Sequence, residues 1–252
     1  PVQTSQEEIT SGQIEEANEP EVKATVPTTQ EEIQETNPLE TVGETEQVQQ
    51  PAESVAATVN AVDTAQHVID PSGIVIPDWI TVDLIHINNV SRPAIALDAV
   101  NDIAIHYVAN PGSSAKANRD YFDSLDNPAV EGAGRQASAH LIVGLDGEVV
   151  QCLPLNEMAY AVRSRNPDTI SIEVCHPDET GKFSDTTYNT LVKLTAWLLQ
   201  QKGLTPDHVI RHFDCDGKYC PLYYVEHEDA WNKLKQDLSL IHISEPTRRR
   251  GI

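Results

Sequence analysis

A sharp change of composition near residue 70 limits how much of this 252-residue chain can fold. Residues 1–70 hold fifteen Asp or Glu and a single Lys, and so carry −14 of the net charge of −22. They contain no Trp, Tyr, Phe or Cys. Such a segment buries too little apolar surface to offset the entropy lost on ordering. We therefore predict a disordered acidic low-complexity spacer over residues 1–72, with a specific binding tail as the alternative.

Neither end of the chain looks like a native terminus. The chain begins with Pro1 rather than Met, so we expect that a secretion signal or anchor preceded it. Together with the acidic spacer, this predicts an extracellular or cell-wall-associated protein. The string "LSLIHISEPTR" at 238–248 matches the translation of a transposon-type sequencing adapter. We therefore expect residues 238–252 to be an unstructured artefact, a natural apolar-then-basic tail being the alternative, and exclude His242 from the site.

The remaining composition argues against two classes of protein. Lys and Arg do not cluster into the basic surface that phosphate binding requires, so we expect no nucleic-acid partner. No apolar run approaches the roughly 20 residues that cross a bilayer, so we expect no membrane span in this fragment.

Residues 73–237 are enough for one domain with its own core, and we expect it to be a monomer. Hydrophobic periodicity and turn residues predict strands over 102–108, 137–144, 148–154, 169–175 and 207–212, and helices over 113–125, 184–203 and 224–236. Asp146-Gly147 predicts a tight hairpin, and Ser184 and Gly203 are typical helix caps. Alternating strands and helices indicate an α/β fold, a central mixed β-sheet flanked by helices.

The stretch "RHFDCDGKYCP" at 211–221 concentrates potential metal ligands. A hydrolytic zinc site uses three His, Cys or carboxylate ligands and leaves one position for water. His212 and Cys220 are two candidates, so a third must come from elsewhere. His106 is the leading choice because it ends a buried strand ahead of a Gly/Pro/Ser loop, where ligands are often placed. A hydrogen-bonded core histidine is the alternative.

Four motifs carry a resemblance to a known family: "AIHYVANPGSSA", "SAHLIVGLDGEVVQCLPL", "ISIEVC" and "HFDCDGKYCP". Their order and separation over residues 95–237 resemble the zinc-dependent N-acetylmuramoyl-L-alanine amidases of the T7-lysozyme type, related to peptidoglycan recognition proteins. The resemblance implies His106, His212 and Cys220 as ligands of Zn²⁺, and peptidoglycan as the substrate. The expected reaction is hydrolysis of the amide between N-acetylmuramic acid and L-alanine.

The resemblance also implies two catalytic residues, Glu173 in "ISIEVC" and Lys218 in "GKYC". A carboxylate facing the attacking water can take its proton and pass it to the leaving amine. An ammonium can stabilise the oxyanion of the tetrahedral intermediate. Glu173 interrupts an apolar strand, where a carboxylate is costly to bury, which favours a functional role. A solvent-facing strand residue and a solvated loop lysine are the alternatives.

This chain departs from parts of the family pattern. Ala139 stands where some relatives carry a catalytic tyrosine, which leaves Glu173 as the expected base. Other relatives use Asp in place of Cys220. We interpret His140 as structural or substrate-facing, and expect the loops 109–116 and 156–168 to wall the substrate groove. The predicted substrate-binding residues are His140, Asn110, Arg163 and Arg165, the two arginines for stem-peptide carboxylates.

The other cysteines leave weaker alternatives open. A disulfide among Cys152, Cys175 and Cys215 suits an exported protein, but spacing does not assign partners. Cys215 also allows a structural zinc knuckle, although the chain lacks the accompanying ligand pattern. Cys175 followed by His176 resembles a thiol-protease pair, but adjacent strand residues point to opposite faces of a sheet.

Two alternative functions remain open. The first is a peptidoglycan recognition module that binds muropeptides without cutting them, a class in which the cysteine ligand is typically lost. The second is a phage endolysin with the same chemistry. Retention of Cys220, Glu173 and Lys218 favours catalysis.

Overall fold

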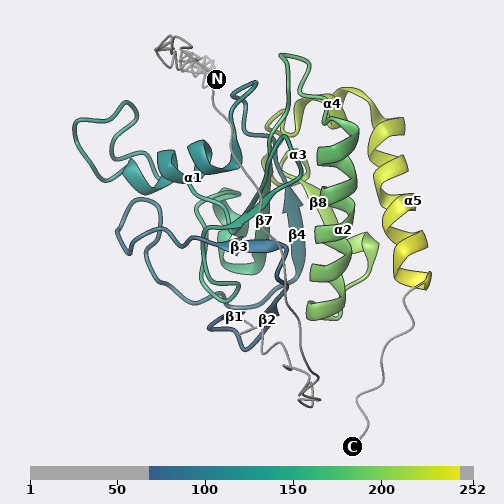
Figure 1. Cartoon of the computed structure of the whole chain (residues 1–252), viewed down its shortest axis with the longest axis horizontal. Helices are drawn as coiled ribbons and strands as arrows, with labels where there is room; N and C mark the ends of the chain where they lie inside the picture. The colour runs from purple at the N-terminus through teal and green to yellow at the C-terminus, as the bar shows by residue number, and fades with distance from the viewer. Residues whose placement is uncertain (1–67, 245–252) are drawn as a thin grey trace, which may run out of the picture. The chain divides into compact units, whose positions relative to one another are not determined.

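The structure, a computed structural model, describes residues 68–244 (Figure 1). The predicted disorder of residues 1–67 lies outside this range. Residues 68–72 belong to the fold, which corrects the predicted boundary at 73: β1 (Val68–Ile69) pairs antiparallel with β2 (Val75–Ile76). Asp70 is buried and accepts hydrogen bonds from the backbone N–H of Leu155 and the amide of Gln151. This buried carboxylate fastens the β1–β2 hairpin to the loop that follows the main sheet's hairpin.

The centre of the fold is a six-stranded mixed sheet, as the sequence predicted. In spatial order its strands are β3 (Ile80–Val82), β6 (Val149–Gln151), β5 (Leu141–Val143), β7 (Thr169–Val174), β4 (Asp102–Ile105) and β8 (Val209–Arg211). Only β5 and β6 run antiparallel to each other, and Gly147, at φ 81°, makes the predicted turn between them. The sequence missed β1, β2 and β3, because strands of two or three residues carry too little alternation to be recognised.

Helices cover both faces of the sheet. They are α1 (Ala115–Ser124), α2 (Asp185–Lys202), α3 (Phe213–Asp216), α4 (Leu222–Glu226) and α5 (Glu228–Ser244), with 3-10 turns η1 (Arg163–Asp168) and η2 (Pro206–His208). The predicted caps of α2 are confirmed: Ser184 Oγ accepts from the N–H of Thr187, and Gly203 is left-handed at φ 67°. Figure 1 shows α2 and α5 together on one side of the sheet and α1 on the other.

Alternation along the strands produces two apolar cores. Ile103, Ile105 and Ile172 join one buried cluster with side chains of α2 and α5. Ile142 and Cys175 join a second cluster with side chains of α1. Successive strand residues point to opposite faces, so the positions that follow Ile105 and Ile172 belong to the α1 side of the sheet.

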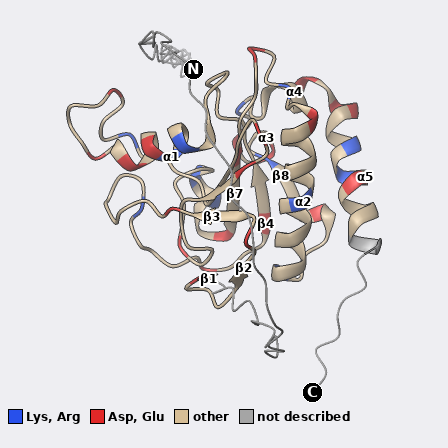
Figure 2. Cartoon of the chain, in the orientation of Figure 1, with Lys and Arg blue, Asp and Glu red and all other residues tan. Residues whose placement is uncertain are grey.

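Charged side chains tie α1 to the loop that follows β3. In Figure 2 both signs of charge are interspersed along α1 and α5. Arg119 is only 10% exposed; it pairs with Asp123 at 2.7 Å and donates to the carbonyls of Asp83 and Leu84. No helix within residues 68–244 has both the length and the apolar character needed to cross a bilayer.

The last helix extends further than the sequence suggested. It was predicted to end at residue 236, with an unstructured artefact from residue 238, whereas α5 continues to Ser244. Leu234 and Leu238 lie four residues apart, and both are fully buried in the cluster that α2 and α5 share. This i, i+4 apolar stripe explains the continuation, so residues 238–244 are helical and not unstructured as expected. Residues 245–252 lie outside the described range.

Candidate metal centre

The register of three parallel strands brings the predicted site together. Strand β4 pairs with β7 on one side and β8 on the other. The backbone N–H of His106 donates to Ile172 O at 2.9 Å, and that of His212 donates to Ile105 O at 3.2 Å. His106, His212 and Glu173 are therefore level with one another near the carboxyl ends of neighbouring strands. Side chains at the same level of in-register parallel strands share a face of the sheet.

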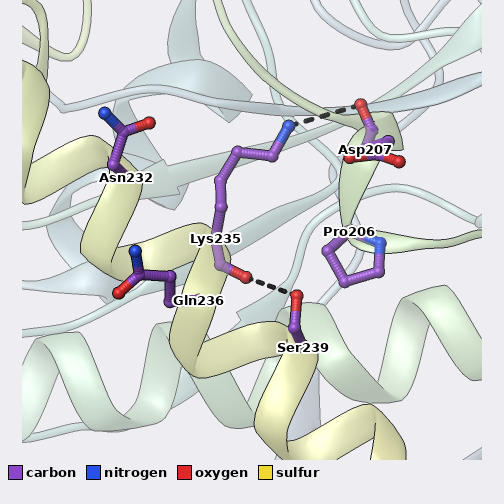
Figure 3. A pocket seen from close by; sticks show the side chains of 6 residues that line it. All are labelled: Pro206, Asp207, Asn232, Lys235, Gln236 and Ser239. Carbon is purple, nitrogen blue, oxygen red and sulfur yellow. Dashed lines mark hydrogen bonds between the residues drawn. The ribbon is translucent and has the colours of Figure 1, made fainter.

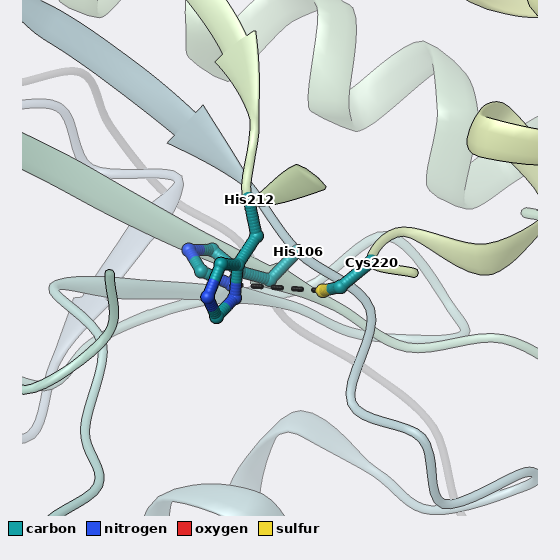
Figure 4. A group of neighbouring side chains, drawn as sticks. All are labelled: His106, His212 and Cys220. Carbon is teal, nitrogen blue, oxygen red and sulfur yellow. Dashed lines mark hydrogen bonds between the residues drawn. The ribbon is translucent and has the colours of Figure 1, made fainter. Parts of the chain in front are cut away.

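His106 and His212 form a compact donor cluster with Cys220 (Figure 4). The Nδ1 atoms of His106 and His212 are 3.1 Å apart, and Cys220 Sγ lies 3.7 Å from His106 Nδ1. The donor atoms of all three residues lie within 4.8 Å of one another, and all three residues are buried. The structure thus places His106 beside His212 and Cys220, the two candidates from the 211–221 stretch.

A short loop returns Cys220 to His212. Helix α3 makes one turn and ends at Gly217, whose φ of 81° lets the chain reverse. The backbone N–H of Phe213 then donates to Cys220 O at 3.0 Å and closes the loop. Arg211 precedes His212 and points to the opposite face, where it bonds Glu228 at 2.6 Å and the carbonyl of Tyr224 at 3.0 Å. The loop is thus anchored on the side away from the cluster.

The donor set fits zinc. Tetrahedral zinc with Zn–N near 2.0–2.1 Å and Zn–S near 2.3 Å places two nitrogens about 3.3 Å apart and a nitrogen and sulfur about 3.6 Å apart. The separations of 3.1 and 3.7 Å are close to these values. Burial lowers the pKa of His106 and of His212, which keeps both imidazoles in the neutral form that binds metal. Burial raises the pKa of Cys220, and a dication would offset that cost of forming the thiolate.

Glu173 lies beside this cluster with an unsatisfied carboxyl oxygen. The residue keeps some exposed surface, but its Oε2 is buried and has no hydrogen-bond partner. Burial raises its pKa to about 8, and the positive charges of Lys218 and Arg135 oppose that rise. Lys218 is exposed. The sequence missed Arg135, because it belongs to a loop that comes near Glu173 only in the folded chain.

Asp216 is a second residue that the sequence missed. Its Oδ2 lies 3.3 Å from His212 Nε2 and forms an ion pair with Arg163, whose Nε is 3.1 Å away. Its Oδ1 accepts from the backbone N–H of Lys218 at 3.0 Å. The spacing of four residues from His212 was the available signal, since such pairs are neighbours on a helical turn.

Two predicted substrate-binding residues require correction. His140 is fully buried, and both ring nitrogens are engaged: Nε2 with Glu157 O at 2.8 Å, and Nδ1 as the acceptor of Ser171 N–H at 3.0 Å. Its role is therefore structural. Arg165 bonds Asp102 and Asp168, which stand at the amino ends of β4 and β7, away from the cluster. Its charge is therefore paired at the amino end of β4, a strand about 13 Å long whose other end carries the cluster.

The other two predicted contacts lie at the carboxyl end of the sheet. Arg163 is 81% exposed and bonds Asp216 on the metal-loop side. Asn110 is half-buried in the turn after β4, where its carbonyl accepts from Ser113 Oγ at 2.6 Å. Ala139, at the position of the tyrosine found in some relatives, is fully buried. Arg163 and Asn110 therefore remain available for the proposed groove.

The cysteine alternatives are not supported. All four cysteines are free, so no disulfide joins Cys152, Cys175 or Cys215. Cys215 Sγ contacts the carbonyl of Arg211 at 3.8 Å, outside the donor cluster. Cys175 Sγ contacts the amide of Asn118 at 3.6 Å. These thiols pack in the fold and do not form a second centre.

A shallow hollow on the surface is separate from the cluster. It lies between α5 and the turn η2, at the amino end of β8 (Figure 3). Its lining residues are Pro206, Asp207, Asn232, Lys235, Gln236 and Ser239. The ammonium of Lys235 is directed at the backbone carbonyls of Asp207 and Val209. Ser239 Oγ donates to the carbonyl of Lys235, so two of the polar side chains in this hollow already have partners within the fold.

The fold and the cluster define a class: an α/β domain with a His/His/Cys centre at the carboxyl ends of parallel strands. A profile of the N-acetylmuramoyl-L-alanine amidase family matches residues 96–223, and the chain belongs to that family. This confirms the resemblance seen in the sequence motifs.

Individual relatives agree with this membership. N-acetylmuramoyl-L-alanine amidase CwlL of Bacillus licheniformis is 30% identical over 155 residues, covering 57% of this chain and 42% of its own. BlyA of Bacillus subtilis (strain 168) is 29% identical over 195 residues, covering 67% and 50%. The catalytic domain of XlyA matches with a TM-score of 0.52 at 28% identity, over 63% of this chain and 98% of that domain. The chain spans about half the length of the curated relatives it matches.

Proposed function

We propose that this domain is a zinc-dependent amidase that cuts peptidoglycan between N-acetylmuramic acid and the L-alanine of the stem peptide. The observation that supports this proposal most directly is the buried donor cluster of His106, His212 and Cys220, which lies beside the unpaired carboxyl oxygen of Glu173. Family membership supports this reaction. A domain with this substrate acts outside the cell or at the cell wall, and we propose that it does so as a monomer.

Each residue then has a role. His106, His212 and Cys220 would hold the zinc ion, which would supply Lewis acidity to the scissile carbonyl and the attacking water. Glu173 takes a proton from the attacking water and returns it to the amine that leaves. The positive charge of Lys218 favours the carboxylate form of Glu173 and stabilises the oxyanion that forms on the scissile carbonyl.

Substrate is proposed to lie along the carboxyl ends of the strands, between the loops 109–116 and 156–168. Arg163 presents an exposed guanidinium there, suited to a stem-peptide carboxylate, and Asn110 offers an amide. The rival function is a recognition module that binds muropeptide without cutting it. Glu173 and Lys218 have no evident use in such a module.

The activity is tested by incubating the protein with purified cell wall and measuring new L-alanine N-termini. We expect release that stops when a chelator removes the metal and returns when Zn²⁺ is added, because the three ligands leave a position open for chemistry. Release that is insensitive to the chelator would exclude the zinc mechanism. Tight binding of muropeptide without release would favour the recognition module.

Replacing Lys218 by Gln should lower kcat about 10- to 100-fold with a smaller change in KM. The ammonium acts on charge that develops in the transition state, but water screens this exposed side chain and limits the loss. Lys233→Gln removes an exposed lysine from α5, outside the proposed groove, and is the control, expected to keep full activity. Equal activity of the two variants would remove Lys218 from the mechanism.

A further inference from the structure

The carboxylate of Asp216 joins three parts of the site. Oδ2 faces His212 Nε2 at 3.3 Å and Arg163 Nε at 3.1 Å. Oδ1 accepts from the backbone N–H of Lys218 at 3.0 Å. Its side chain is 19% exposed, although the residue as a whole is exposed, as are Gly217 and Lys218 beside it. One carboxylate thus contacts a ligand, the chain leading to Cys220, and the neighbouring loop.

These contacts determine how the ring of His212 is presented. An imidazole that donates its Nε2–H to a carboxylate leaves the lone pair of Nδ1 free for a metal, and the same hydrogen bond fixes the orientation of the ring. His212 Nδ1 is the nitrogen that faces His106 Nδ1 at 3.1 Å. The contact with Asp216 therefore lies on the side of the ring opposite the other donors.

We propose that Asp216 is a positioning residue for the zinc ligand His212, selecting the tautomer that presents Nδ1 to the metal. Arg163 holds the same carboxylate from the loop 156–168 and keeps it directed at the ring. The bond from Lys218 N–H holds the other oxygen within the loop. This inference rests on the metal centre of the proposed function.

The test measures zinc affinity rather than turnover. Metal-free wild type and variants compete with a chromophoric chelator for Zn²⁺, and the visible spectrum of the Co²⁺ form reports ligand geometry. We expect Asp216→Ala to raise the zinc Kd about 10- to 100-fold, the usual effect of losing such a partner. Asp216→Asn keeps an acceptor for Nε2–H and should fall between Asp216→Ala and wild type. The Co²⁺ spectrum of Asp216→Ala should differ from that of wild type.

The controls separate positioning from charge and folding. Glu179→Gln removes an exposed carboxylate from the loop after β7 and should leave the zinc Kd unchanged. Thermal unfolding of the metal-free proteins shows whether each variant is folded. A folded Asp216→Ala protein with wild-type zinc affinity and Co²⁺ spectrum overturns the inference alone. A wild type that binds no zinc overturns both the inference and the proposed metal centre.

Discussion

Replacing Glu173 by Gln should lower kcat about 10²- to 10⁴-fold, the usual contribution of a positioned general base. Glutamine matches the shape of the side chain but cannot accept the proton of the attacking water. Glu173 Oε2 is buried and has no hydrogen-bond partner in the described part of the chain, so the substitution breaks no hydrogen bond of this oxygen. The measurement is the initial rate of L-alanine N-terminus release from cell wall at saturating zinc.

The same variant should keep its metal and its fold. Glu173 is not one of the three clustered donors, so the zinc Kd should stay close to that of wild type. Removing a buried carboxyl group should not lower the melting temperature, because its burial is costly and opposes its ionisation. Glu179→Gln is the matched control and should keep full activity. Full activity of Glu173→Gln would overturn the base assignment while the metal centre stands.

Replacing Leu238 by Ala should lower the free energy of unfolding by about 2–5 kcal/mol, the usual cost of truncating a buried leucine. Leu238 is fully buried in the cluster that joins the sheet to α2 and α5. Its loss removes apolar burial and leaves a cavity between packed elements. The measurement is equilibrium unfolding in urea, where the midpoint should fall and the slope should stay the same.

Leu240 provides a control on the same helix. It is 66% exposed, so Leu240→Ala should change the free energy of unfolding by less than about 0.5 kcal/mol. The two substitutions remove the same atoms and differ in burial. Equal stabilities of the two variants would show that residues from 238 onward do not pack in this domain.

Much of the secondary structure could be predicted because its signals are local. Ser184 and Gly203 delimit α2 through their own hydrogen bonds and backbone angles. Gly147 makes the β5–β6 turn through a positive φ that most residues avoid. The end of α5 was misjudged because a suspected origin of the string at 238–248 outweighed its helical periodicity. The apolar spacing from Leu234 to Leu238 was visible in the sequence itself.

The sequence by itself determined the kinds of donor in the site and their order along the chain. Only the tertiary structure decided which polar side chains face that site. Both ring nitrogens of His140 form hydrogen bonds with the backbone. Arg165 pairs with a carboxylate at the amino end of β4, whereas Asp216 contacts His212. Motifs and caps depend on neighbours in sequence, whereas a long polar side chain bonds whichever partner strand register and loop closure bring within about 3 Å.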